Sequence, residues 1–136
     1  MFLCKTEIRK SAIEGHGVFV LEDISEGFTV WQFDPKHDKS ISQENFEKLS
    51  EDKRREIEKV GYLSPTSGMW IYSLEGSDHF TNHSSSRNNL TTVFDATISP
   101  EPFFRANRAI SKDEELIVNY LEFDEFIKNT KPDWAK

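Results

Sequence analysis

The stretch HFTNHSSSRNNL (residues 79–90) holds two histidines, three asparagines and three consecutive serines within twelve positions. Side chains of this kind compete with the backbone for hydrogen bonds, so the stretch predicts a loop. Three kinds of site use such a loop: a metal site, a glycosylated surface segment, or a loop that holds a ligand. The remainder of the sequence decides among them.

Composition narrows the class of protein. The chain of 136 residues is long enough for one domain with a hydrophobic core. Its formal net charge is −7, with 24 acidic and 17 basic residues, which disfavours a nucleic-acid partner and favours a basic protein or peptide. No apolar run approaches the length of a membrane span, and no secretory signal is visible. With a single cysteine, Cys4, we expect a reduced, intracellular and cytoplasmic protein.

These expectations weigh against glycosylation and metal binding. The segments 82–84 and 89–91 match the N-glycosylation pattern, but the pattern is short and matters only in a secreted chain. His79 and His83 are four positions apart, a spacing useful for a metal on a helix, yet their surroundings do not predict a helix. No CxxC or HExxH motif accompanies them. We therefore predict no metal site.

Hydrophobic patterning predicts a mainly β domain with short helices. Short runs rich in Val, Ile, Thr and aromatic residues are separated by turn signals, at residues 17–21, 28–33, 69–74, 90–94, 103–110 and 115–120. The charged segment 42–60 has a helical pattern, with a stripe of Phe46, Leu49, Ile57 and Val60 and a capping box from Ser40 and Gln43. A short helix is expected before Pro132.

Three motifs in this order resemble the SET domain of protein-lysine methyltransferases. They are GHGVFVLEDISEGFTV (15–30), FTNHSSSRNN (80–89) and RAISKDEELIVNYLEFD (108–124). The resemblance covers about residues 7–124, and the segment W-x-F-D-P at Trp31–Pro35 is similar to that of small stand-alone bacterial members. It implies one SET domain over residues 1–136, a β-clip-like fold of several small sheets with a C-terminal pseudoknot, and a tail at 125–136 that closes the cofactor site.

The resemblance also implies that the stretch at residues 79–90 is a ligand-binding loop. The implied cofactor is S-adenosyl-L-methionine, with S-adenosyl-L-homocysteine as product, and Asn88 matches the asparagine that pins the loop. The residues implied to contact the cofactor are Gly15, His16, Gly17, Asn82, His83, Tyr120 and Trp134. A structural Asn/His cluster and an ordinary glycine turn are the alternatives for these positions.

Tyr120 matches the catalytic tyrosine, which would orient the target amine for in-line methyl transfer. An apolar channel would lower the pKa of the lysine amine so that it can attack. The expected lining residues are Phe33, Tyr62, Tyr72 and Val118, each of which could equally be a core residue. Val118 is small and would leave room for more than one methyl group.

The sequence departs from the family pattern at several positions. Ser85 and Arg87 replace the usual cysteine and proline, Asp113 replaces a glycine before the E-E-L motif, and Leu121 replaces a glycine after the tyrosine. The cysteines of flanking zinc segments are absent, so the C-terminal tail would have to close the site without a metal. Within this tail, Trp134 would cover either the adenine or the interface of a homodimer. Two functions stay open: an active protein-lysine methyltransferase acting on a basic protein, and an inactive SET-like module that binds a peptide or cofactor.

Overall fold

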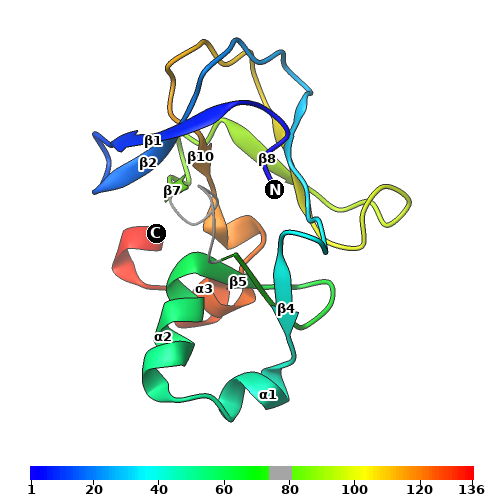
Figure 1. Ribbon diagram of the computed structural model, residues 1–136. Helices are drawn as coiled ribbons and strands as arrows, with labels where there is room; N and C mark the ends of the chain where they lie inside the picture. Colours follow the sequence, from blue (N-terminus) through cyan, green and yellow to red (C-terminus); the bar gives the residue numbers. More distant parts are fainter. Residues whose placement is uncertain (74–80) are drawn as a thin grey trace.

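The computed structural model describes residues 1–73 and 81–136, and within them the protein is mainly β with short helices (Figure 1). The strands are β1 (Thr6–Lys10), β2 (His16–Val20), β3 (Thr29–Trp31), β4 (Lys39–Ile41), β5 (Gly61–Leu63), β6 (Trp70–Tyr72), β7 (Asn82–His83), β8 (Leu90–Val93), β9 (Phe103–Ala106) and β10 (Ile117–Val118). The helices are α1 (Gln43–Glu47), α2 (Glu51–Val60) and α3 (Glu125–Thr130), with 3-10 turns η2 (Tyr120–Glu122) and η3 (Asp133–Ala135). The predicted fold class is confirmed.

The strands form four small sheets instead of one large one. An antiparallel hairpin pairs β1 with β2, and two three-stranded antiparallel sheets have the orders β3-β9-β8 and β4-β6-β5. The fourth sheet pairs β7 with β10 in parallel, with Asn82 opposite Ile117 and His83 opposite Val118. Because β8 and β9 lie between these two strands in the sequence, the parallel pair brings two distant segments together.

The segment that follows β7 holds β10 at both of its ends. The amide of Ser84 donates to the carbonyl of Val118 at 3.0 Å, and the amide of Asn89 donates to the carbonyl of Ile117 at 3.1 Å. The buried side chain of Asn89 completes the clamp: Nδ2 donates to the Glu115 carbonyl at 2.8 Å, and Oδ1 accepts from the Ile117 amide at 2.8 Å. Asn88 instead makes a local bond to the Leu90 carbonyl, so the predicted anchor was one residue too early.

The predicted helix at 42–60 is two helices. Ser50 accepts a hydrogen bond from the Lys53 amide and caps α2, so the chain is extended between α1 and α2. The first helix is capped by Ser42 through the Asn45 amide, and the predicted capping box from Ser40 was wrong because Ser40 lies in β4. Sequence patterning also missed β1, β4 and β5, which are short or strongly charged.

Two hydrophobic clusters support the sheets. The larger contains Val18, Val20, Val30, Leu90 and Leu116, all nearly inaccessible to solvent. In the smaller cluster, α1 and α2 pack on β6: Phe46 stacks on Trp70 with ring centres 4.7 Å apart, and Ile57 is buried beside them. The expected apolar stripe therefore packs against the sheet that contains β6, and Leu49 is partly buried against the smaller cluster.

The predicted C-terminal helix is confirmed as α3, and it is attached to β5 by its capping residue. Asp124 is buried, and its Oδ1 accepts hydrogen bonds from the amides of Phe126, Ile127 and Leu63. The first two bonds cap α3 and the third fixes it to β5. The pKa of Asp124 is raised to about 6, chiefly because the carboxyl is buried.

The Asn89 clamp generates a stability prediction. Asn89→Ala leaves the part-buried Ile117 amide and Glu115 carbonyl without these partners, so it should lower the free energy of unfolding by about 2–4 kcal/mol. The matched variant Asn88→Ala should cost less than about 1 kcal/mol, because only one local hydrogen bond is lost. Urea unfolding of the two variants measures the difference, and equal losses would contradict the clamp.

Candidate active site

A wide cleft lies along the chain segments that the sequence singled out. Its volume is about 720 Å³, within the range of small-molecule sites. Six of the seven residues predicted to contact a cofactor line it: Gly15, His16, Asn82, His83, Tyr120 and Trp134. Gly17, the seventh, is buried in β2 outside this lining.

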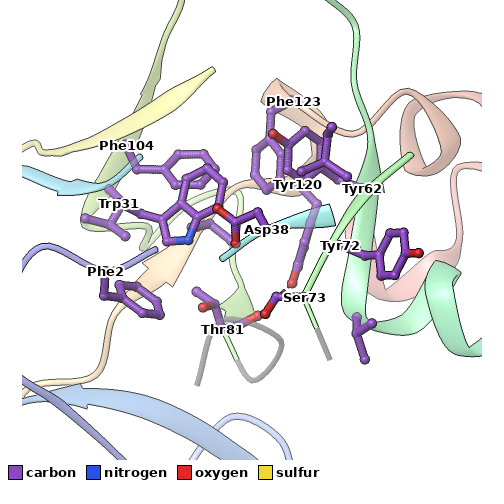
Figure 2. Close-up of a pocket in the computed structure, with 15 residues that line it drawn as sticks. Phe2, Trp31, Asp38, Tyr62, Tyr72, Ser73, Thr81, Phe104, Tyr120 and Phe123 are labelled. Carbon is purple, nitrogen blue, oxygen red and sulfur yellow. Dashed lines mark hydrogen bonds between the residues drawn. The ribbon is translucent and has the colours of Figure 1, made fainter. Parts of the chain in front are cut away.

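A narrow cavity of about 60 Å³ lies beside the cleft (Figure 2). Tyr62, Tyr72 and Val118 line it, together with the rings of Trp31, Phe104 and Phe123. Phe33, the fourth residue expected in a substrate channel, is not part of this lining and packs against the larger core cluster. The walls are therefore mainly aromatic and apolar.

The cleft and the narrow cavity share three residues: Gly61, Thr81 and Tyr120. Tyr120 thus borders the wide cleft on one side and the narrow, mainly apolar cavity on the other. The hydroxyl of Tyr120 donates to the Thr81 carbonyl at 2.8 Å, which fixes the direction of the ring. Burial raises the pKa of Tyr120, and the charge of Asp124 adds to this, so the phenol stays protonated at neutral pH.

His83 connects three segments through its two ring nitrogens. Nδ1 accepts from the Tyr120 amide at 3.0 Å, so the ring hydrogen is on Nε2, which donates to the Ala135 carbonyl at 3.1 Å. The ring also stacks on Tyr120 at 5.8 Å between centres and meets the edge of Trp134 at 5.6 Å. Burial lowers the pKa of His83, partly offset by the Ala135 carbonyl, and the neutral ring is the form that this bonding needs.

Asn82 is held by a carboxylate that the sequence analysis did not select. Its Nδ2 donates to Glu115 Oε2 at 2.7 Å and to the carbonyls of His16 and Glu14 at 3.0 and 3.2 Å. Glu115 also accepts from the Ser11 hydroxyl at 2.7 Å. Because the donors of Asn82 Nδ2 are used within the protein, Asn82 can offer a ligand its carbonyl oxygen and its backbone.

The double-glycine turn has two physical functions. Gly15 adopts a φ of +47°, which favours glycine, at the start of β2. At Gly17 a Cβ atom would collide with the carboxylate of Glu115, so glycine permits the approach of Glu115 to Asn82. A glutamate after another glutamate carries no signal that would have revealed this role from sequence.

Asp113, which replaces a glycine of the family pattern, keeps the left-handed backbone that glycine would favour, with a φ of 74°. Its carboxylate accepts from Arg9 at 2.8 Å. The substitution therefore retains a turn rather than removing it.

Trp134 lies in η3 at the edge of the cleft. Its side chain is 57% exposed, and it contacts His83 and Tyr120 edge-on. A large exposed ring next to a cleft is available to cover a ligand.

Within residues 1–73 and 81–136, no group of three or more His, Cys, Asp or Glu side chains is arranged to hold a metal ion. His79, half of the histidine pair, lies outside the described residues. The same part of the chain contains no helix with the length and apolar composition of a membrane span.

The comparisons with known proteins agree with this geometry. The family model of the SET domain matches residues 15–121, which is most of the chain, so the protein belongs to the SET domain family. Members of this family are typically protein-lysine methyltransferases. The search of curated proteins finds no match.

Solved structures with the same fold include proteins from three eukaryotes. A Plasmodium falciparum protein provisionally assigned as a histone methyltransferase is 26% identical, with a TM-score of 0.55, over 84% of this chain and 91% of that one. A Chaetomium thermophilum Polycomb Repressive Complex 2 structure bound to GSK126 is 25% identical, with a TM-score of 0.66, over 94% of this chain and 17% of that one. CpSET8 from Cryptosporidium is 24% identical, with a TM-score of 0.59, over 83% of this chain and 56% of that one, and shows the fold alone. The chain thus spans 17% of the Chaetomium thermophilum protein and 56% of CpSET8.

The bonding of His83 predicts a pH dependence of stability. Its folded-state pKa lies below the ordinary value of about 6.5, so between these values the unfolded chain binds more protons. Stability should therefore fall as the pH drops from about 6.5 through the folded pKa, because protonated Nδ1 cannot accept from Tyr120.

Thermal unfolding across this pH range, with wild type, His83→Gln and the matched variant His16→Gln, measures the effect. Asp124 has a raised pKa and contributes the opposite slope, but it is present in all three proteins and cancels in the comparison. We expect the His83-dependent slope in wild type and His16→Gln and its loss in His83→Gln. The same slope in all three would contradict the assignment.

Proposed function

We propose that this protein is a methyltransferase that transfers a methyl group from S-adenosyl-L-methionine to a lysine side chain of a protein. The observation that supports this most is the position of Tyr120, where the wide cleft and the narrow apolar cavity meet. Two reactants that enter from different sides can be aligned at that point. Alignment of this kind can provide a large part of a rate enhancement.

The wide cleft fits the cofactor in size and chemistry. Its volume suits a ligand of nucleoside size, and it offers an exposed indole, a glycine turn and the carbonyl oxygen of Asn82. We propose that Gly15, His16, Asn82 and His83 hold the methionine and adenosine parts and that Trp134 covers the adenine. When bound, S-adenosyl-L-methionine supplies a methyl group from its sulfonium and becomes S-adenosyl-L-homocysteine.

His83 would contact the cofactor through its ring face and backbone. Both ring nitrogens already bond to protein groups, the Tyr120 amide and the Ala135 carbonyl. His83 therefore connects the loop that follows β7 to Tyr120 and to the C-terminal tail, and these bonds would hold the three segments in place when the cofactor binds.

The narrow cavity would take the lysine side chain. A free lysine has a pKa of about 10.4, and only the neutral amine can attack the methyl group. Apolar walls disfavour the ammonium, and the rings of Tyr62 and Tyr72 can still accommodate a cation or a methylated amine. Val118 adds little bulk at this point and would permit more than one methylation.

Tyr120 would orient the amine and not act as a base. Its hydrogen is donated to the Thr81 carbonyl, so a lone pair on the hydroxyl oxygen can accept a hydrogen bond from the amine. With a raised pKa, the phenol does not ionise at neutral pH. The lone pair of the nitrogen is then directed along the line of transfer.

The net charge of −7 favours a basic protein or peptide as the partner that carries the target lysine. The Plasmodium falciparum protein is provisionally assigned as a histone methyltransferase, so histones and other lysine-rich proteins are suitable first substrates for a test. The identity of the target lysine is a separate question from the reaction.

Tyr120→Phe tests the reaction. The change removes one hydroxyl, so cofactor binding and folding should persist while the rate of methyl transfer from radiolabelled cofactor falls at least about tenfold. Calorimetry of cofactor binding to the variant serves as the internal control. Full activity in the variant would remove Tyr120 from the mechanism, and a wild-type protein that binds cofactor but methylates no substrate would favour an inactive binding module.

Trp134→Ala tests the cofactor contact of the tail. Loss of a stacked indole should weaken cofactor affinity by about 5- to 100-fold, on the scale of base–aromatic stacking. Phe94→Ala removes another exposed aromatic side chain, 55% exposed and outside the cleft, and should leave affinity unchanged. If Trp134→Ala changes the oligomeric state but not cofactor affinity, the ring belongs to a subunit interface.

A further inference from the structure

A carboxylate is buried in the wall of the narrow aromatic cavity. Asp38 is only 5% exposed and lines the cavity with Trp31 and Tyr62, and Figure 2 shows its carboxylate among these rings. A charged group in such surroundings is costly unless it is paired. The function proposed above uses only the apolar walls of the cavity and gives Asp38 no role.

The two oxygens of Asp38 differ in their contacts. Oδ2 accepts from the Asp34 amide at 2.8 Å and from the amino group of Met1 at 3.2 Å. Oδ1 is buried and has no hydrogen-bond partner among the described residues, and His37 Nε2 lies 4.0 Å from it. One oxygen therefore fixes the side chain, and the other is a buried acceptor without a hydrogen-bond partner among the described residues.

The surroundings of this acceptor favour a cation. Tyr62 donates its hydroxyl to Glu101 at 3.2 Å, and Glu101 is itself 5% exposed. The pKa of Tyr62 is raised by burial and further by the charges of Glu101 and Asp38, which indicates a negative potential along this wall. Aromatic faces of Trp31 and Tyr62 add to the attraction for a positive group.

The cavity also limits the size of the cation. Because a water needs about 10–15 Å³ of such volume, about 60 Å³ has room for roughly four to six groups of that size. A lysine side chain beyond Cβ consists of three methylenes and an amine. An arginine side chain beyond Cβ has six heavy atoms and only just reaches the upper end of this range, and a metal ion with its water shell exceeds it.

We propose that Asp38 recognises the substrate in its charged form, with Oδ1 accepting a hydrogen bond from the ammonium of a primary alkylamine side chain as it enters the cavity. The identification of that amine as the target lysine rests on the proposed function. The ion pair is a binding step at entry: the amine then moves from Asp38 to Tyr120 and releases its proton to water, because the apolar walls there favour the neutral form that attacks. Asp38 is thus a specificity-determining residue that acts on substrate affinity.

The cation site can be tested without methyl transfer. In NMR titrations of the full chain, n-butylammonium should bind about tenfold or more tightly than 1-butanol and should shift the Trp31 indole resonance, as expected for a charged hydrogen bond. Asp38→Asn retains an oxygen for the Asp34 amide and should abolish this preference. The matched variant Asp34→Asn, whose residue does not line the cavity, should keep it.

Equal binding of n-butylammonium and 1-butanol by the wild type would overturn the inference even if Asp38→Asn failed to fold. Displacement of n-butylammonium by sodium or potassium chloride at matched ionic strength would overturn it too, in favour of a metal-cation site. Once a peptide that the protein methylates has been identified, Asp38→Asn should raise the KM for that peptide at least about tenfold without lowering kcat in proportion. Methylation without any ammonium preference would overturn the role of Asp38 alone, and ammonium preference without methylation would overturn the proposed function alone.

Discussion

The candidate site depends on the parallel pairing of β7 with β10. Two residues of each strand pair, which is too little to persist without side-chain support. Asn89 supplies part of that support at one end of the loop, and His83 supplies it at the Tyr120 amide. Because the same pairing places Asn82, His83 and Tyr120 around one space, the arrangement that stabilises the fold also assembles the site.

Neutral polar groups carry most of this assembly. His83 must be uncharged to accept from Tyr120 and donate to Ala135, and the phenol of Tyr120 must keep its proton to donate to Thr81. Burial enforces both states, since it lowers the pKa of the imidazole and raises that of the phenol. Asp38 stands apart as a buried carboxylate with one oxygen that lacks a hydrogen-bond partner among the described residues, which is why its position requires a functional explanation.

The sequence predicted the fold class, the family and six of the residues around the cleft, because each depends on motifs with short-range requirements. The glycine turn, the Asn-His pair and Tyr120 after a hydrophobic strand could each be recognised where they stand. Strands β1, β4 and β5 could not, because they are short or charged, and β4 in addition pairs with a strand distant in the sequence. Glu115 and Asp38 were missed for a related reason: an acidic residue in a charged chain gives no sign of the cavity or the amide that it faces.

We propose that the cofactor and the target lysine meet at Tyr120, the cofactor from the wide cleft and the lysine from the narrow cavity. A crystal structure of the full chain with S-adenosyl-L-homocysteine and a lysine-containing substrate peptide tests this claim most directly. We expect the adenosyl and homocysteine groups in the wide cleft beside Asn82 and His83, and the lysine in the narrow cavity with its nitrogen near the hydroxyl of Tyr120. Both ligands in the same cleft, or a lysine bound away from Tyr120, would contradict the account.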